Sequence, residues 1–269
     1  MKQMRNKCGF TYDLKTFFRR KTPSFFQGAK RVYLKTEQFR LALKKSYDES
    51  RLRRVSRLYY YLVAQKPASD VGADWAETCY YDDAEKVMDD AWDRLVWPFI
   101  KDCDFSSVVD LAAGHGRNSD KLKEMADHIH IVDINQSNID FCKNRFAANP
   151  KFRFSKTNGI SLGAIPSNSV TLVYSFDSMV HFDSDVIRAY LAEFRRVLKP
   201  GGRGFCHHSN YIGNPCGDFR KHKGWRNFMS RELFAHYCAK EGLVVIRSKL
   251  IDWVDPEVDC FTLFERPNV

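Results

Sequence analysis

The stretch of sequence that decides the fold is VVDLAAGHGRNS, residues 108–119. Its apolar first half is typical of a strand buried in a parallel sheet, and Gly114 and Gly116 follow it. Glycine tolerates positive φ and close approach of a ligand, and a helix from about Asn118 to Ala126 would present free N–H groups at its start. We therefore predict a strand, a ligand-binding turn and a helix, although two glycines after a strand also form an ordinary tight turn.

The sequence after Ser106 alternates short apolar runs with helical segments, which predicts an α/β protein with helices on both faces of a doubly wound sheet. In the clearest helix, 184–198, Ile187, Leu191 and Phe194 share one face, and we expect Ser184 to cap its start and Lys199-Pro200-Gly201-Gly202 to end it. The expected strands are 108–112, 129–134, 152–154, 170–176 and 204–206, with two closing strands at 244–251 and 260–264.

The positive charge of the chain is concentrated at its beginning. The 269 residues carry a net charge of +10, but residues 1–66 alone contain 18 Lys and Arg against 4 Asp and Glu. No Gly or Pro interrupts residues 33–64, where Phe39, Leu43 and Tyr47 recur at every fourth position, so we predict a basic amphipathic helix. We interpret residues 1–72 as a basic helical extension that contacts an anionic membrane surface or a phosphorylated substrate, or that is simply a solvated or core-docked helix.

A helical lead-in covering the active site is expected at residues 73–105, because Val87, Ala91, Leu95 and Phe99 recur at every fourth position. Residues 106–269 form the predicted core. We see no secretion signal or membrane-spanning run, so we expect a cytoplasmic protein, peripheral at the membrane if the basic extension binds there. The eight cysteines are expected to be reduced, and no metal site is predicted; the nearest cluster is Cys206, His207, His208, Cys216 and His222.

A carboxylate at the end of the second strand suggests which ligand the turn binds. Asp133 follows Gly116 by 17 residues, a position from which a carboxylate accepts hydrogen bonds from a ribose. An adenosine-containing cofactor is therefore favoured. NAD is disfavoured, because Ser119 stands where the dinucleotide fingerprint has Gly or Ala.

The core resembles the class I S-adenosyl-L-methionine-dependent methyltransferases from about residue 106 to 266. The motif at 109–116 matches the family's first motif except that Ala112 replaces its first glycine, and 132–133, 157–159, 173–177 and 195–202 are similar to its later segments. The resemblance implies a mostly parallel, seven-stranded, Rossmann-like sheet whose last strand is antiparallel. It implies S-adenosyl-L-methionine as cofactor, bound by Asp110, Ala112, Gly114, Gly116, Asn118, Asp133, Ile134, Asn158, Gly159 and Phe176. Gly114 and Gly116 would lie against the methionine part, Asp133 would hold the ribose and Asn158 the adenine end.

Histidines follow the fourth and fifth strands, where the methyl acceptor is expected. A base must take the proton of an alcohol acceptor, and we name His181 and His208 as candidates, with Asp177 or Asp183 to orient the imidazole. Each histidine is otherwise an ordinary loop residue. Residues 210–229 are expected to form a lid or binding loop, with Tyr211, Trp225, Arg220 and Arg226 available for rings and anions, or else a plain surface loop.

These observations favour O-methylation of a small molecule or a glycan by direct in-line transfer with a histidine base. Two alternatives stay open: an RNA methyltransferase whose basic N-terminus grips phosphates, and a methyltransferase-like subunit that binds the cofactor without turnover. Nucleic acid is the less favoured partner. An NAD-dependent oxidoreductase is the least favoured reading, because of Ser119.

Overall fold

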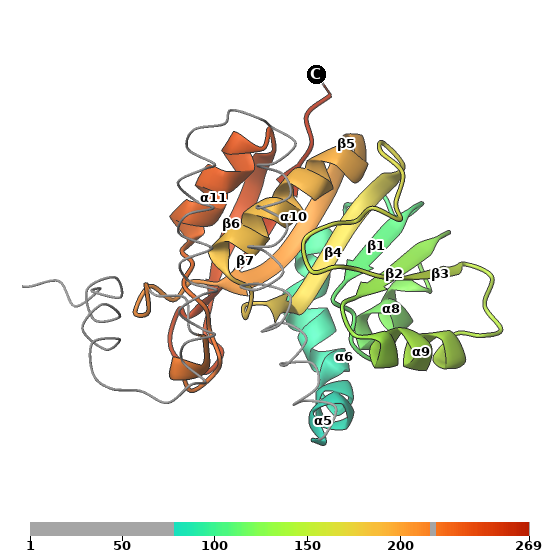
Figure 1. Cartoon of the computed structure of the whole chain (residues 1–269), viewed down its shortest axis with the longest axis horizontal. Helices are drawn as coiled ribbons and strands as arrows, with labels where there is room; N and C mark the ends of the chain where they lie inside the picture. Colours follow the sequence, from blue (N-terminus) through green and yellow to red (C-terminus); the bar gives the residue numbers. More distant parts are fainter. Residues whose placement is uncertain (1–77, 216–218, 269) are drawn as a thin grey trace, which may run out of the picture. The chain divides into compact units, whose positions relative to one another are not determined.

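The computed structural model describes residues 78–215 and 219–268, which are coloured in Figure 1. The predicted basic extension at residues 1–72 and its helix at 33–64 lie outside the described residues. Among those described, no helix is long and apolar enough to cross a membrane, and no cluster of His, Cys, Asp and Glu could hold a metal ion. The cysteines in this part of the chain are free thiols.

A seven-stranded sheet in the order β3-β2-β1-β4-β5-β7-β6 forms the centre of the fold (Figure 1). The first five strands pair in parallel, whereas β7 is antiparallel to both of its neighbours. The predicted fold class is therefore confirmed. The strands are β1 (Val108–Leu111), β2 (Ile129–Asp133), β3 (Phe152–Lys156), β4 (Val170–Met179), β5 (Leu198–Ser209), β6 (Val244–Ile251) and β7 (Asp259–Glu265).

Strand β5 begins earlier than predicted. We expected Lys199-Pro200-Gly201-Gly202 to be a turn, but this segment lies within the strand, where the pairing with β4 slips between Val170 and Leu172. Gly202 makes the irregularity possible, because a Cβ there would lie 2.9 Å from the carbonyl oxygen of Lys199. The extra residues form a bulge, which lengthens the strand without breaking it.

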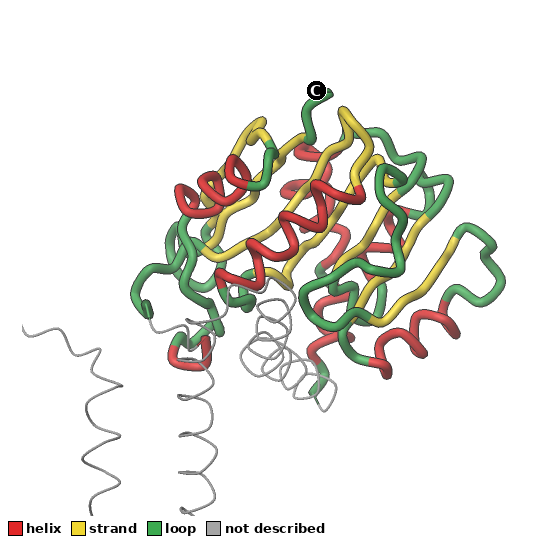
Figure 2. The backbone as a smooth tube through the Cα atoms, turned by 45° about the horizontal axis from the view of Figure 1, so that its top comes forward, coloured by secondary structure: helices red, strands yellow, loops and turns green. Residues whose placement is uncertain are grey.

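Helices cover both faces of the sheet, as Figures 1 and 2 show. Helices α10 (Ser184–Val197) and α11 (Arg231–Lys240) pack on one face. Helices α8 (Arg117–Leu122) and α9 (Gln136–Arg145) pack on the other, together with the segment before β1. The side chain of Asp183 caps α10 by accepting from the N–H of Asp185 at 2.8 Å, so the predicted Ser184 cap is wrong by one residue.

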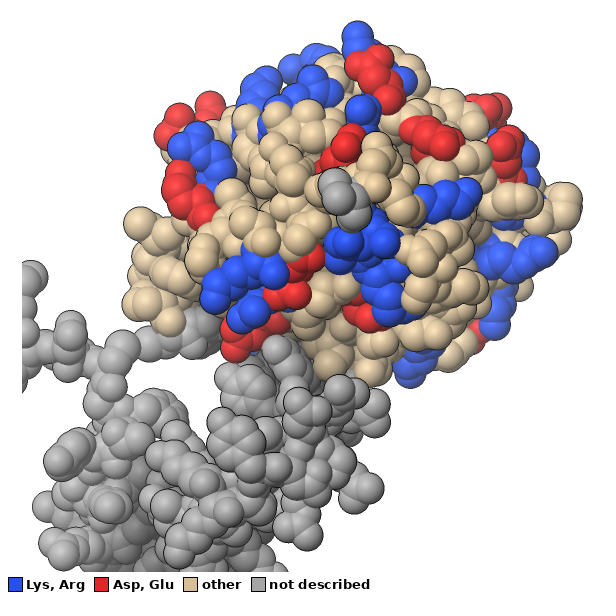
Figure 3. Space-filling view, turned by 90° about the horizontal axis from the view of Figure 1, so that it is seen from above, with Lys and Arg blue, Asp and Glu red and all other residues tan. Residues whose placement is uncertain are grey.

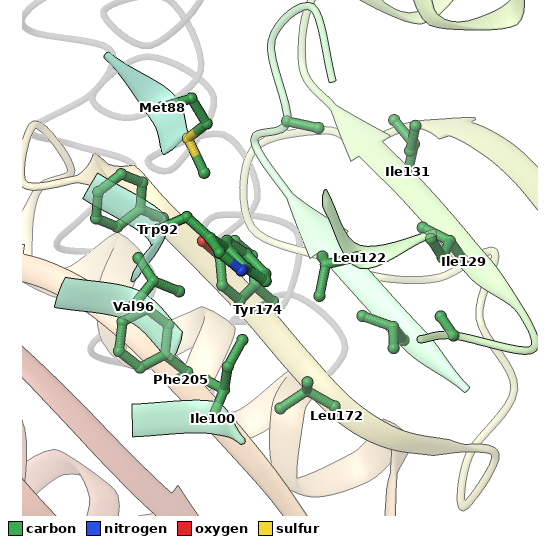
Figure 4. Packing of buried hydrophobic residues seen from close by; sticks show 14 of the residues in the cluster. Met88, Trp92, Val96, Ile100, Leu122, Ile129, Ile131, Leu172, Tyr174 and Phe205 are labelled. Atoms are coloured by element: carbon green, nitrogen blue, oxygen red, sulfur yellow. The ribbon is translucent and has the colours of Figure 1, made fainter. Parts of the chain in front are cut away.

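The segment before β1 is helical but broken, into α5 (Tyr80–Lys86), α6 (Met88–Ala91), a π-helical turn η2 (Trp92–Val96) and α7 (Trp97–Ile100). Pro98 has no N–H for the carbonyl four residues earlier, which accounts for the irregular turn before it. In Figure 4, Trp92 and Val96 lie against Tyr174 of β4 and Phe205 of β5. Burying apolar side chains of this size stabilises the docked segment by about 1.5–3 kcal/mol each.

Basic and acidic side chains are interspersed on the face of the core seen in Figure 3. Residues 1–66 hold 18 Lys and Arg against 4 Asp and Glu, and the rest of the chain holds the other 25 Lys and Arg against 29 Asp and Glu, so the basic excess is confined to the first segment. Any attraction for an anionic partner that depends on clustered charge is expected to arise from that first segment.

Candidate active site

The candidate site lies at the carboxyl ends of β2, β1 and β4. The order of the strands reverses between β1 and β4, and in open α/β sheets ligands bind at such a switch point. The glycine turn follows β1, Asp133 ends β2, and Asp177 lies near the end of β4. The structure therefore brings both predicted carboxylates to the same edge of the sheet.

The turn after β1 has three residues in the left-handed region: Ala112 with φ 58°, Gly114 with φ 57° and Gly116 with φ 80°. Glycine is required at 116, because a Cβ there would lie 2.8 Å from a ring carbon of Phe146. An L-residue such as Ala112 in this conformation costs about 1–2 kcal/mol relative to the right-handed region. Replacing the family's glycine by alanine therefore strains the turn.

Asp133 is buried and ties β2 to the glycine turn. Its Oδ2 accepts from the N–H of Gly114 at 3.0 Å, and its Oδ1 accepts from the N–H of Asn135 at 2.8 Å and from Nδ2 of Asn138 at 3.2 Å. Burial raises the pKa of Asp133, although these donors oppose that shift. The carboxylate is thus held against the turn in a single orientation.

Two buried acceptor atoms next to this arrangement have no hydrogen-bond partner among the described residues: Oδ1 of Asp110 and Oδ1 of Asn138. The other oxygen of Asp110 accepts from Oγ of Ser119 at 2.6 Å. Burial raises the pKa of Asp110 to about 7. Because buried acceptors are normally paired, these two atoms suit a ligand that brings N–H or O–H donors.

Tyr81 of α5 covers the glycine turn. A Cβ on Gly114 would lie 2.6 Å from Cε1 of Tyr81, and the Tyr81 ring stacks on His115, with the ring centroids 3.9 Å apart. His115 in turn stacks on Phe141 at 3.8 Å. Burial raises the pKa of the Tyr81 phenol to about 12, so it stays protonated at neutral pH. Sequence reasoning missed Tyr81, because no motif links it to the turn.

The remaining predicted cofactor positions differ in their surroundings. Thr157 donates its N–H to the carbonyl of Asp133 at 2.8 Å, which brings the turn at Asn158 and Gly159 beside the end of β2. Ile134 is half-buried next to Asp133. Asn118 is buried and accepts from the Tyr174 hydroxyl at 3.0 Å, so its side chain connects α8 to β4. The cofactor roles of these residues stay predictions.

Asp177 lies in an irregular part of β4, where the pairing with β5 slips between Ser175 and Met179, and its φ is 57°. Its Oδ2 accepts from Arg117 at 2.7 Å and from the Tyr80 hydroxyl at 2.8 Å. Burial would raise the pKa of Asp177, but Arg117 and its other polar neighbours outweigh burial and keep that pKa below its usual value. The carboxylate therefore stays ionised. Arg117 and Tyr80 were not predicted, although Arg117 directly follows the first motif at 109–116.

His181 lies just beyond β4, and its tautomer follows from its hydrogen bond. Its Nδ1 lies 2.5 Å from the carbonyl oxygen of Trp225, which can only accept. Nδ1 therefore carries the proton and Nε2 carries the lone pair. Burial lowers the pKa of His181 to about 4, so the ring is neutral at pH 7. In this form Nε2 can accept a proton.

His208 is placed elsewhere. Its ring stacks on Phe234 of α11 at 3.9 Å, Nδ1 donates to the carbonyl of Ser209 and Nε2 accepts from the Thr262 hydroxyl, both at 2.9 Å. Burial lowers its pKa to about 3. Successive side chains of a strand point to opposite faces, so it is His207 that faces Asp177, with Nδ1 3.2 Å from the Asp177 backbone nitrogen. The structure does not bring His208 together with the other candidates.

The predicted binding loop, residues 210–229, is described except at 216–218. Arg226 was expected to pair with a ligand anion, but it is buried and its guanidinium pairs with Asp259 at 2.5 Å. Tyr211 packs on His222, with ring centroids 4.4 Å apart. Phe176 at the end of β4 is also buried, and Trp253, from the loop after β6, packs edge-on against it at 6.0 Å. Trp253 is 39% exposed and also packs against His207, with the ring centroids 5.2 Å apart.

Comparison with known proteins agrees with this geometry. Residues 108–202 match the sequence family described as a methyltransferase domain. The chain is 27% identical over 130 residues to methyltransferase nsrG of Aspergillus novofumigatus, a match that spans 46% of this chain and 50% of that protein. The chain thus matches only half the length of this curated relative.

Solved structures share the fold. An S-adenosylmethionine-dependent methyltransferase of Mesorhizobium loti superposes with a TM-score of 0.54 at 14% identity, over 65% of this chain and 97% of that one. Geranyl diphosphate C-methyltransferase of Streptomyces coelicolor A3(2), solved with Mg²⁺, geranyl diphosphate and S-adenosyl-L-homocysteine, has a TM-score of 0.50 at 16% identity, over 60% of this chain and 71% of that one. Residues 108–202 thus match a methyltransferase domain, and the solved methyltransferase structures share the fold of this chain.

S-adenosylmethionine, the cofactor that the resemblance implies, suits the residues present. It carries an ammonium group and ribose hydroxyls, which are the donors that the unpartnered oxygens of Asp110 and Asn138 lack. Asp133 ends β2, where this fold places a ribose, while Tyr81 lies against Gly114 and Phe146 lies against Gly116. When bound, the cofactor supplies an electrophilic methyl group on a sulfonium ion.

Proposed function

We propose that this protein methylates a hydroxyl group of a small molecule or a glycan, with S-adenosylmethionine as donor and His181 as general base. The observation that carries the proposal is the hydrogen bond of His181 to the Trp225 carbonyl, which assigns the lone pair to Nε2. This atom belongs to a residue directly after β4, the strand that ends beside the glycine turn. Residues from both sides of the switch point thereby serve one site.

His181 has only to accept one proton from the acceptor hydroxyl. As the acceptor oxygen gains a bond to the methyl carbon and the carbon–sulfur bond breaks, the hydroxyl proton becomes strongly acidic. A neutral imidazole takes that proton at Nε2 even with a pKa of about 4. Tyr81 and the rings stacked with it shield the turn from water, and holding two reactants in line supplies much of the rate enhancement.

The residues around Phe176, five positions before His181 in the chain, support a hydroxylated acceptor. Trp253, which is 39% exposed, places an indole ring next to Phe176, and Arg117 lies over the Phe176 ring at 5.9 Å while it pairs with Asp177. An aromatic face beside charged hydrogen-bonding groups suits a sugar or a phenol, whose rings are apolar on their faces and polar at their edges.

The first experiment separates cofactor binding from turnover. Calorimetry with S-adenosylmethionine is expected to give equal affinities for the wild type and His181→Ala. Methyl transfer from the radiolabelled cofactor to a panel of sugars and phenols is expected to fall by about 10²–10⁴-fold in the variant. His236→Ala, on the exposed side of α11, serves as the control and should behave as wild type. Full turnover by His181→Ala would contradict the role of the base.

We further propose that the basic segment at residues 1–66, with 18 Lys and Arg against 4 Asp and Glu, brings the enzyme to an anionic membrane surface. Co-sedimentation with phosphatidylglycerol vesicles is expected at low salt and should weaken as salt rises. Phosphatidylcholine vesicles are the control. Salt-sensitive retention of RNA on a filter, with no vesicle binding, would favour the RNA methyltransferase instead.

A further inference from the structure

A buried ion pair lies behind the candidate active site. Asp259, the first residue of β7, is fully buried, and its two oxygens accept from Nε and Nη2 of Arg226 at 2.8 and 2.5 Å. Its Oδ2 also lies 3.0 Å from Nε2 of His207. A buried carboxylate is costly unless it is paired and hydrogen-bonded, and here one aspartate is satisfied by two different side chains.

One side of this cluster leads to His181. The third nitrogen of Arg226, Nη1, donates to the carbonyl of Gly224 at 2.5 Å. Trp225 lies between these two residues with φ 56°, and its carbonyl accepts from Nδ1 of His181. A left-handed conformation at a non-glycine residue persists only where its surroundings hold it, and the Arg226 guanidinium holds this turn. Asp259 in turn fixes that guanidinium.

The other side leads to Asp177. Nδ1 of His207 lies 3.2 Å from the backbone nitrogen of Asp177, another residue with positive φ. A backbone N–H can only donate, so Nδ1 of His207 is the acceptor and Nε2 carries the proton. That proton points at Asp259, which is the acceptor that selects this tautomer.

We propose that Asp259 is a positioning residue that holds His181 and Asp177 in place through Arg226 and His207. The inference rests on the proposed function in that His181 is taken as the base. Asp259 does not touch the acceptor. It fixes the tautomer of His207 and the turn at Trp225. It thereby holds Asp177 and Trp225, the two residues with positive φ described above.

The ring nitrogens of the histidines provide a test that needs no acceptor. In full-length protein labelled with ¹⁵N at histidine, long-range ¹H–¹⁵N spectra distinguish the two neutral tautomers, and single substitutions of His181 and His207 assign their signals. We expect the proton on Nε2 in His207 and on Nδ1 in His181. The opposite tautomer at His207 in the wild type would overturn the proposal without any variant.

Asp259→Asn probes the cluster directly. If the amide oxygen keeps Nε of Arg226, the amide NH₂ replaces the oxygen that accepts from Nη2 of Arg226 and from Nε2 of His207. We therefore expect Arg226 to lose one of its two bonds to residue 259, and His207 to move its proton to Nδ1 and to release the Asp177 N–H. The signals of His181 should shift, and kcat should fall by about 10²-fold with unchanged cofactor affinity, since small displacements of a base are costly. The matched control is Glu265→Gln, which removes the ion pair with Arg203 at the other end of β7.

Two further variants separate the sides of the cluster. Arg226→Lys should shift the His181 signals and keep the His207 tautomer unchanged. His207→Gln should keep the signals of His181 unchanged. Unchanged signals of both histidines in a folded Asp259→Asn protein would overturn the proposal, as would an equal response to Glu265→Gln. A missing activity in the wild type contradicts the proposed function instead, because the tautomers are measured without turnover.

Discussion

The two halves of the candidate site are built differently. The cofactor half, at the ends of β1 and β2, uses residues close together in the sequence: Gly114 and Asp133 are 19 residues apart and hydrogen-bonded directly. The acceptor half, at the ends of β4, β5 and β7, joins residues much further apart, such as His207 and Asp259, which are separated by 52 residues. Local motifs thus define the first half, and only tertiary contacts assemble the second.

The difference predicts opposite consequences for the two histidines first named as bases. His181→Ala should lower kcat by about 10²–10⁴-fold with little change in stability, because Nε2 is the proposed proton acceptor. His208→Ala should instead cost about 2–4 kcal/mol in stability, because its ring is stacked on Phe234 and both nitrogens are hydrogen-bonded. Steady-state kinetics and denaturant unfolding of both variants check this, and equal loss of kcat in the two would erase the distinction.

A substitution in the cofactor half should change the affinity for S-adenosylmethionine. Asp133→Asn keeps the shape of the side chain but offers one acceptor where three donors now converge. We expect the affinity for S-adenosylmethionine to fall by about 10–100-fold, the range of one or two charge-assisted hydrogen bonds. Calorimetry measures it, with Asp140→Asn on the exposed side of α9 as control. An unchanged affinity would remove Asp133 from the cofactor site.

Acid should destabilise the protein through its buried histidines. The pKa of His208 is about 3 in the folded chain and about 6.5 when exposed, so the unfolded state binds the extra proton as pH falls below 6.5. The stability that neutral His208 retains at pH 7 is lost progressively on acidification, by about 2 kcal/mol at pH 5.

The check is urea unfolding of the wild type and His208→Gln at pH 7 and pH 5. Glutamine does not titrate, so the stability of His208→Gln should fall less between pH 7 and pH 5 than that of the wild type. The two losses of stability should differ by about 2 kcal/mol. Comparing the two proteins cancels groups that titrate in both, including Asp110, whose raised pKa acts in the opposite direction. Parallel pH dependences would show that His208 is not buried in its neutral form.

The smallest effect is expected at Ala112. Glycine adopts a φ of 58° without strain, but it also loses more conformational entropy on folding than alanine. We expect Ala112→Gly to stabilise the protein by about 0.5–1 kcal/mol, measured by denaturant unfolding at pH 7. A loss of stability of that size would mean that the turn favours alanine for another reason.

The fold could be predicted because its signals are local. Apolar runs of strand length, separated by helical periodicity, indicated all seven strands, and the glycine turn marked the switch point. The errors fell where packing overrides local preference. Lys199-Pro200-Gly201-Gly202 is typical of a turn, yet the neighbouring strand β4 draws it into β5.

By itself, the sequence determined the α/β architecture, the glycine turn and the carboxylate at the end of β2, because each depends on residues near one another in the chain. The tertiary structure alone decided which histidine faces the site. His207 and His208 are adjacent and chemically identical, but the pleat of β5 points one toward Asp177 and the other under α11. The tertiary structure also decided that Arg226 pairs with Asp259. The buried guanidinium of Arg226 needs a partner of opposite charge, and Asp259 supplies it from β7, 33 residues further along the chain.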